Sequence, residues 1–100
     1  MAEKKKYVVW SFEEVKESLQ RRFPGAPLGE ILRILTETLI LRAEEGRRAP
    51  PPYGPGAMTL TIEELTTQGL YKITALYEIF KEDQAVDLFD VGLVKLEEDL

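Results

Sequence analysis

Three observations predict a mainly α-helical single domain with a small β-hairpin, arranged like a winged helix. The chain has 100 residues, enough for one hydrophobic core but not for two. Apolar residues recur at helical spacing through its first half. In the second half, turn signals separate a short helix, a longer helix and a hairpin, which is the order of elements in a winged helix-turn-helix. We therefore expect one domain over residues 1–100.

The composition argues against catalysis and against a membrane location. The chain has no Cys and no His, which removes thiol nucleophiles, the usual general bases and the soft metal ligands. Ser11 is explained as a helix cap, and Ser18 has no neighbouring base in the sequence. We expect no enzyme activity and no cofactor. The apolar runs are too short for a membrane span or a signal peptide, so we expect a cytoplasmic protein.

The chain has no Asn, Cys or His but six Pro and many Glu, Lys and Arg, a profile poor in thermolabile residues that suggests a thermophilic source.

An extended N-terminal segment over residues 1–10 is expected to lead into a helical hairpin over residues 11–46. Ser11-Phe12-Glu13-Glu14 has the pattern of a capping box, and Pro24-Gly25 should end the first helix after Phe23. The second helix is expected from Pro27 to Glu45, with Gly46 as its stop. Its Ile34 and Leu41 fall outside the main apolar stripe. Another element of the domain covers this second face, or a partner does.

Residues 47–57 are rich in Pro and Gly and are expected to form a linker loop. Residues 58–100 should then form a helix-turn-helix with a wing. Thr61-Ile62-Glu63-Glu64 repeats the capping-box pattern, so a short helix is expected to end near Thr67, followed by a turn at Gly69. A longer helix should span Leu70–Lys81. The alternative is one continuous helix through Gly69.

The last segment fits two structures. Val86, Phe89, Leu93, Leu96 and Leu100 have heptad spacing, whereas Val86-Asp87-Leu88 and Val94-Lys95-Leu96 alternate like strands. Asp90-Val91-Gly92 favours a turn between them, so we expect a hairpin of 85–89 and 93–97. The carboxylates of this segment lack the spacing of a calcium loop, and we expect them to form a solvated acidic surface.

Charge is distributed unevenly along the chain. Residues 1–48 carry 10 Lys and Arg against 8 Asp and Glu, a balance of +2, while residues 49–100 carry 3 against 10, a balance of −7. An acidic half repels phosphate and suits a basic partner surface. A DNA-binding regulator is the alternative, and its contacts would be Lys4, Lys5, Lys6, Arg21, Arg22 and Lys72.

Residues 59–96 also resemble a known family. The strings Thr59-Leu60-Thr61-Ile62-Glu63-Glu64-Leu65, Ile73 to Lys81, and Val86-Asp87-Leu88 are similar to the C-terminal winged helix of prokaryotic kleisins, the segregation-and-condensation subunits. The resemblance implies binding to the ATPase head of a structural-maintenance-of-chromosomes (SMC) protein.

The expected function is thus a non-catalytic protein-interaction module, for which the resemblance implies a role in chromosome segregation or condensation. A helical assembly subunit that self-associates is a further alternative. The resemblance implies that Val86, Leu88, Val94 and Leu96 lie near the partner contact. Self-association would use Ile34 and Leu41.

Overall fold

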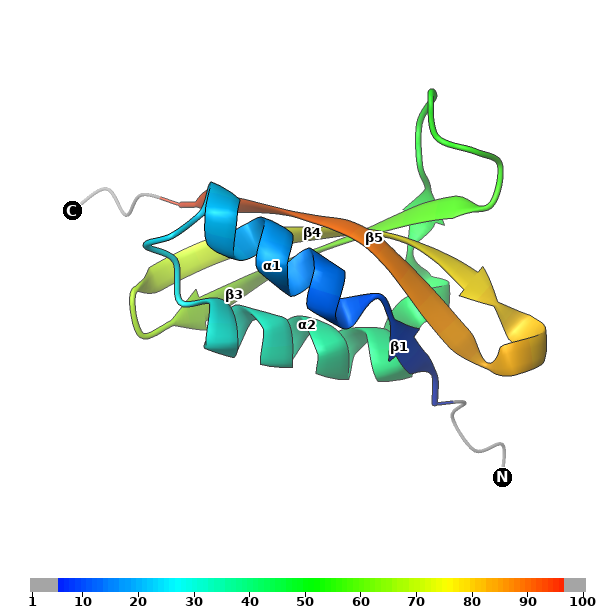
Figure 1. Cartoon of the computed structure of the whole chain (residues 1–100), viewed down its shortest axis with the longest axis horizontal. Coiled ribbons are helices and arrows are strands. Elements are labelled where there is room, and N and C mark those ends of the chain that lie inside the picture. The colour runs from blue at the N-terminus through cyan, green and yellow to red at the C-terminus, as the bar shows by residue number, and fades with distance from the viewer. Residues whose placement is uncertain (1–5, 97–100) are drawn as a thin grey trace.

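Two helices cover one face of a five-stranded sheet in the computed structural model, which describes residues 6–96 (Figure 1). The elements in chain order are β1 (Val8–Trp10), α1 (Phe12–Arg22), α2 (Leu28–Arg42), the 3-10 helix η1 (Ala43–Glu45), β2 (Arg47–Arg48), β3 (Ala57–Thr66), β4 (Gly69–Phe80), the 3-10 helix η2 (Lys81–Asp83) and β5 (Ala85–Lys95). The strand order is β1-β5-β4-β3-β2. Only β1 pairs in parallel, with β5, and the other pairs are antiparallel.

The prediction of a mainly α winged helix is wrong, because both helices expected after residue 58 are strands. Their buried residues alternate with period two, which is the period of a strand with one covered face. In β4 the inward residues are Tyr71, Ile73, Ala75, Tyr77 and Ile79. Thr61, expected to cap a helix, instead contacts the Thr74 hydroxyl across β3 and β4 at 3.1 Å. Apolar residues at helical spacing therefore fall on both faces of the sheet: Ile62 and Ile73 are buried, whereas Leu65 is exposed.

The expected wing is also absent from the described residues, because β5 runs unbroken from Ala85 to Lys95. Asp90-Val91-Gly92 is not a turn. It follows an irregularity in the β4–β5 register, where Leu76 pairs with Asp90 and Tyr77 with Leu88. Phe89 is therefore the extra residue of a β-bulge, which bends the strand without ending it.

The two helices of the first half are confirmed at Phe12–Arg22 and Leu28–Arg42. The capping box at Ser11 is wrong. Ser11 has a φ of 66° and makes no side-chain cap, and its hydroxyl donates a 2.6 Å hydrogen bond to Asp87 of β5. Ser11 thereby joins the start of α1 to the sheet. Neither helix is long and apolar enough to span a membrane within the described part of the chain.

Tyr77 connects the centre of the sheet to the end of the helical layer. Its side chain is fully buried, and its hydroxyl donates a 2.6 Å hydrogen bond to the carbonyl of Ala43 in η1. The chain after η1 passes close to Tyr77 and to β3. A Cβ on Gly46 would lie 2.1 Å from the Tyr77 hydroxyl and 2.8 Å from the Thr59 carbonyl oxygen. Gly46 follows the end of the helical segment at Glu45, as the sequence suggested, and its amide bonds to the Ala43 carbonyl oxygen. Its backbone there is extended, so the close approach and not a left-handed conformation requires glycine.

We expect Gly46→Ala to lower the free energy of unfolding by about 2 kcal/mol, because neither buried Tyr77 nor the β3 backbone can move away from the added methyl. Urea unfolding of the purified chain measures this change. Gly29→Ala is the matched control, since a Cβ there meets nothing within 4 Å, and it should be neutral or slightly stabilising. Equal losses in both variants would contradict the assignment.

Burial, with a smaller contribution from the charge of Glu45, raises the pKa of Tyr77 to about 12. An unfolded tyrosine titrates near pH 10, so the stability due to protonated Tyr77 is complete below pH 10 and is lost as the pH rises towards 12. We expect the free energy of unfolding to fall by about 2 kcal/mol more between pH 10 and 12 in the wild type than in Tyr77→Phe. Urea unfolding at a series of pH values measures it, and identical slopes would contradict the burial of this hydroxyl.

Candidate functional site

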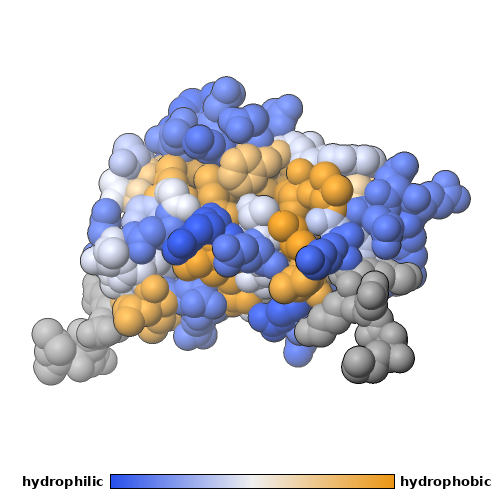
Figure 2. Space-filling view, turned by 90° about the horizontal axis from the view of Figure 1, so that it is seen from below, coloured by the Kyte–Doolittle hydropathy of each residue, from blue (hydrophilic) through white to orange (hydrophobic). Residues whose placement is uncertain are grey.

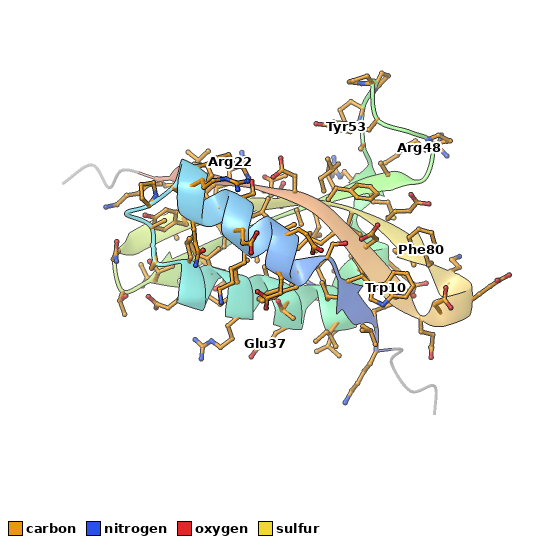
Figure 3. The ribbon with its side chains drawn as sticks, viewed as in Figure 1. Trp10, Arg22, Glu37, Arg48, Tyr53 and Phe80 are labelled. Atoms are coloured by element: carbon orange, nitrogen blue, oxygen red, sulfur yellow. The ribbon has the colours of Figure 1, made fainter. Side chains whose placement is uncertain are left out.

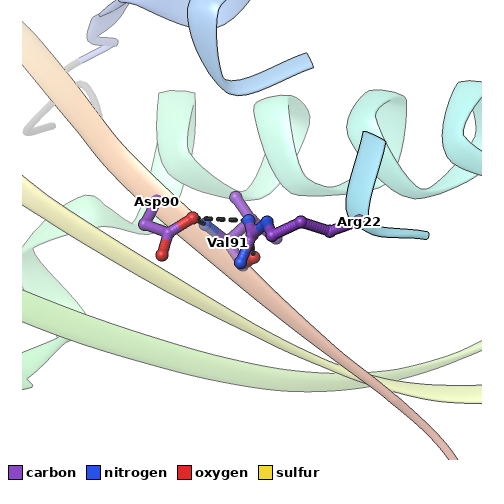
Figure 4. A network of polar contacts seen from close by, with 3 residues as sticks. All are labelled: Arg22, Asp90 and Val91. Atoms are coloured by element: carbon purple, nitrogen blue, oxygen red, sulfur yellow. Dashed lines mark hydrogen bonds and ion pairs between the residues drawn. The ribbon is translucent and has the colours of Figure 1, made fainter. Parts of the chain in front are cut away.

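The edge of the sheet formed by β5 is covered from Ala85 to Val91. β1 covers its first three residues, and beyond them α1 lies against it. Arg22, in the last turn of α1, donates to the Asp90 carboxylate at 2.6 Å and to the Val91 carbonyl oxygen at 3.0 Å (Figure 4). Arg22 thus bonds to a backbone carbonyl with which a further strand would have to pair.

The opposite edge is open for most of its length. β2 pairs with β3 only at Met58 and Thr59, so residues 60–66 of β3 have a strand on one side alone. Next to this short ladder, the Ala49 amide donates to the Ala57 carbonyl oxygen at 2.9 Å. The segment beyond has no proline and no bulge, which are common protections of an edge strand.

The backbone groups that face outward on this free edge can be assigned from the hydrogen-bond parity. In an antiparallel ladder alternate residues bond to opposite sides, and Ala57 bonds towards β2. Thr61, Glu63 and Leu65 share its parity and so direct their amides and carbonyls outward. The closure of β3 and β4 by a two-residue turn after Thr66 agrees, because the residues flanking such a turn bond to each other.

Polar contacts fix the turn end of the free edge. The Glu30 carboxylate, at the start of α2, accepts hydrogen bonds from the Thr67 amide at 3.2 Å and from the Thr67 hydroxyl. Thr66 accepts a 3.1 Å bond from the Gln68 amide and donates at 2.8 Å to the Gly69 carbonyl. The turn and the edge it carries are therefore held in place against α2.

A hollow of about 430 Å³ lies at the other end, where η1 and β2 meet β3. Its lining residues are Glu45, Arg47, Thr59, Leu60, Thr61 and Lys72. Glu45 is paired with Arg42 at 3.0 Å. Neither Arg47 nor Lys72 forms an ion pair among residues 6–96. The hollow therefore presents two cations without a direct ion pair, although Glu63 lies opposite Lys72 on the neighbouring strand and Glu45 shares the lining.

The free edge itself is acidic. Glu63 and Glu64 lie at its middle, Glu30 stands at its turn end, and β3 contains no Lys or Arg. Glu63 is exposed on the uncovered face of the sheet, and Leu65, 70% exposed, follows it there. Leu70, paired with Leu65, and Val94, 56% exposed, continue the apolar surface across β4 and β5.

Two other apolar surfaces lie away from this edge. Trp10 of β1 and Phe80 of β4 stack in a tilted arrangement with ring centroids 5.7 Å apart, at the end of the sheet where the chain enters (Figure 3). Between α1 and α2 is a groove of about 470 Å³ with Phe12 and Leu32 in its lining. On the side of the molecule that α2 covers, Figure 2 shows an apolar band between hydrophilic margins.

The predicted partner-binding residues do not form one surface. Val86 and Leu88 are buried in the core under the helices. Val94 is exposed on the open face and Leu96 is half-buried beside it. Ile34 packs against the core at partial exposure, whereas Leu41 is 45% exposed on α2. The second helical patch is thus divided between intramolecular packing and the surface.

The proposed nucleic-acid contacts are also dispersed. Lys4 and Lys5 lie outside the described residues, and Lys6 precedes β1. Arg21 and Arg22 end α1, and Arg22 is committed to Asp90. Lys72 lies on the sheet face that the helices leave uncovered, so the structure does not join it to the arginines.

Sequence reasoning missed Thr61, Glu63, Leu65 and Arg47, the residues that define the free edge and its end. The alternation of Leu60 and Ile62 with Thr59, Thr61 and Glu63 was the signal that could have found the strand. Among the described residues no group of three carboxylates is arranged to hold a metal ion.

Comparisons with known proteins found no matching family model, no matching curated protein and no matching solved structure. Nothing in them bears on the kleisin resemblance, but the winged helix it implied is not the fold of residues 59–96.

Amide hydrogen exchange will test the free edge. The amides of Thr61, Glu63 and Leu65 should exchange at least about tenfold faster than those of Leu60, Ile62 and Glu64, because only the latter donate to β4. Two-dimensional NMR after transfer into deuterated water measures each residue separately. The Gly92 and Val94 amides, which donate to β4, provide an internal reference for a protected strand. Uniform protection along β3 would contradict a free edge.

Proposed function

We propose that the chain is a non-catalytic protein-binding module that takes an extended basic segment of a partner protein onto the free edge of β3. The observation that supports this most directly is the contrast between the two edges. β1, α1 and Arg22 cover the β5 edge as far as Val91, while residues 60–66 of β3 have a strand on one side alone and keep a row of outward backbone donors and acceptors. Adding a strand to such an edge is a common mode of peptide recognition.

Charge selects the kind of segment. Glu63, Glu64 and Glu30 border the edge, and Lys72 of β4 lies opposite Glu63. Three carboxylates against one ammonium group leave the edge negative, so a segment carrying Lys or Arg is attracted and an acidic one is repelled. A second copy of this chain fits less well, since pairing two β3 edges brings Glu63 and Glu64 of both copies onto one short interface, where like charges are destabilising.

The distribution of charge also argues against DNA binding. The cations expected to contact phosphate are dispersed over two sides of the sheet, and the most accessible backbone lies beside carboxylates. The lack of His and Cys supports a binding role over an enzymatic one.

The test selects peptides from a library of random heptapeptides over the ¹⁵N-labelled full chain. We expect selected peptides to carry excess Lys and Arg and to shift the amide resonances of Thr61, Glu63 and Leu65. Glu63→Pro should weaken binding at least about tenfold, because it removes an outward amide while leaving the β4 ladder intact. Circular dichroism verifies that this variant folds.

Glu63→Gln and Glu37→Gln form a matched charge pair, since Glu37 lies on α2 beside the helical groove. Only Glu63→Gln should reduce affinity for the basic peptides and its dependence on salt. Peptides that perturb the α1–α2 groove alone, a chain that dimerises through β3, or a library that yields no binder would each overturn the proposal.

A further inference from the structure

The added segment must end or turn away at a defined point, because the chain itself occupies the rest of the edge. β2 runs antiparallel to β3 and holds the positions opposite Met58 and Thr59. Gly46 enters the sheet in close contact with the Thr59 carbonyl and the Tyr77 hydroxyl. A docked segment cannot take its place. A segment docked on residues 61–65 therefore meets the η1–β2 junction and has no backbone to pair with beyond it.

The charges at this junction distinguish the two directions in which a segment can run. A strand parallel to β3 would bring its beginning to the hollow, and an antiparallel strand would bring its end there. Arg47 and Lys72 line the hollow without ion pairs, and Glu45 is engaged by Arg42. An α-ammonium group would meet two cations, whereas a terminal carboxylate would be held by both.

Resting on the proposed function, we propose that the segment is the free C-terminal tail of the partner, antiparallel to β3, with its terminal carboxylate bound by Arg47 and Lys72. Arg47 is the principal contact, because it lies opposite Thr59, on the same side of β3 that the tail occupies. Its guanidinium offers two parallel donors to a carboxylate.

The register then specifies the side chains of the tail. Its last residue lies opposite Thr61, its third-last opposite Glu63 and its fifth-last opposite Leu65, and all three point to the uncovered face of the sheet. The third-last position favours Lys or Arg beside Glu63. The fifth-last favours an apolar residue, which would pack on Leu65 and Leu70.

Two displayed libraries of random heptapeptides test this proposal on the full chain. In one the peptide ends in a free carboxyl group, and in the other the same peptide is followed by a Gly-Ser extension. We expect enrichment only from the first, with a cation at the third-last position. The free acid of a selected peptide should bind at least about tenfold more tightly than its C-terminal amide, measured by fluorescence polarisation.

Arg47→Gln should remove this difference between acid and amide, while Arg33→Gln, a cation of the α1–α2 groove, should leave it unchanged. Glu63→Gln should lower affinity for both peptides and preserve their ratio. Circular dichroism and the β3 amide shifts verify folding and the docking position in each variant.

The outcomes separate the two levels of the proposal. Equal enrichment from both libraries, or equal binding of acid and amide with the β3 amides still perturbed, overturns the C-terminal tail and leaves strand addition standing. A parallel orientation, shown by cross-strand nuclear Overhauser contacts from a basic residue near the peptide's start, does the same. No binder from either library overturns both.

Discussion

The contact between Tyr77 and the η1 turn determines where the helical layer ends and where the sheet edge becomes free. A phenol hydroxyl in the interior must have a hydrogen-bond partner, and the Ala43 carbonyl supplies it at the end of the helical segment. With the Tyr77 ring fixed there, Gly46 has room only for hydrogen as its side chain. The backbone at Gly46 can therefore approach β3, and two residues of β2 pair before the chain leaves the sheet.

This short pairing produces an asymmetric sheet. The β5 edge is covered by β1, by α1 and by the Arg22 guanidinium, which donates to the Val91 carbonyl oxygen. The β3 edge has a strand on one side alone over residues 60–66. Natural sheets usually protect an edge with charge, and the glutamates of β3 serve that purpose against self-pairing. In the proposed binding mode the same carboxylates would also discriminate among partners, because they would disfavour acidic strands and a second copy of the chain. Protection from aggregation and selectivity in binding then have one physical origin.

The two halves of the chain differ in how far their structure could be predicted. The helices at Phe12–Arg22 and Leu28–Arg42 were predictable because Pro24-Gly25 separates them and their apolar stripes fit one period. In β3 the residues Ile62 and Leu65 suit a helix as well as a strand, and the Thr61 to Glu64 string imitates a helix start. Propensity could not settle the choice, since cross-strand pairing with residues far along the chain decides it.

The candidate site was less predictable still. Arg47 was assigned to a linker, and its importance depends on Lys72, which β4 brings to the same hollow. No local pattern contains that relation. The acidic character of the second half was predicted from composition, and the structure shows where part of it is located: Glu63 and Glu64 lie on an edge strand.

The parallel pairing of β1 with β5 affects the order in which the fold can assemble. Residues 8–10 lie against residues 85–87, so the first strand has no place in the sheet until residues 85–87 have been synthesised. Until then the β3–β4 hairpin, which forms from neighbouring residues, has a second unprotected edge along β4. Arrival of β5 covers that edge, and α1 then closes the side beyond it. During synthesis the growing chain is therefore most exposed to wrong strand pairing between the emergence of β4 and that of β5.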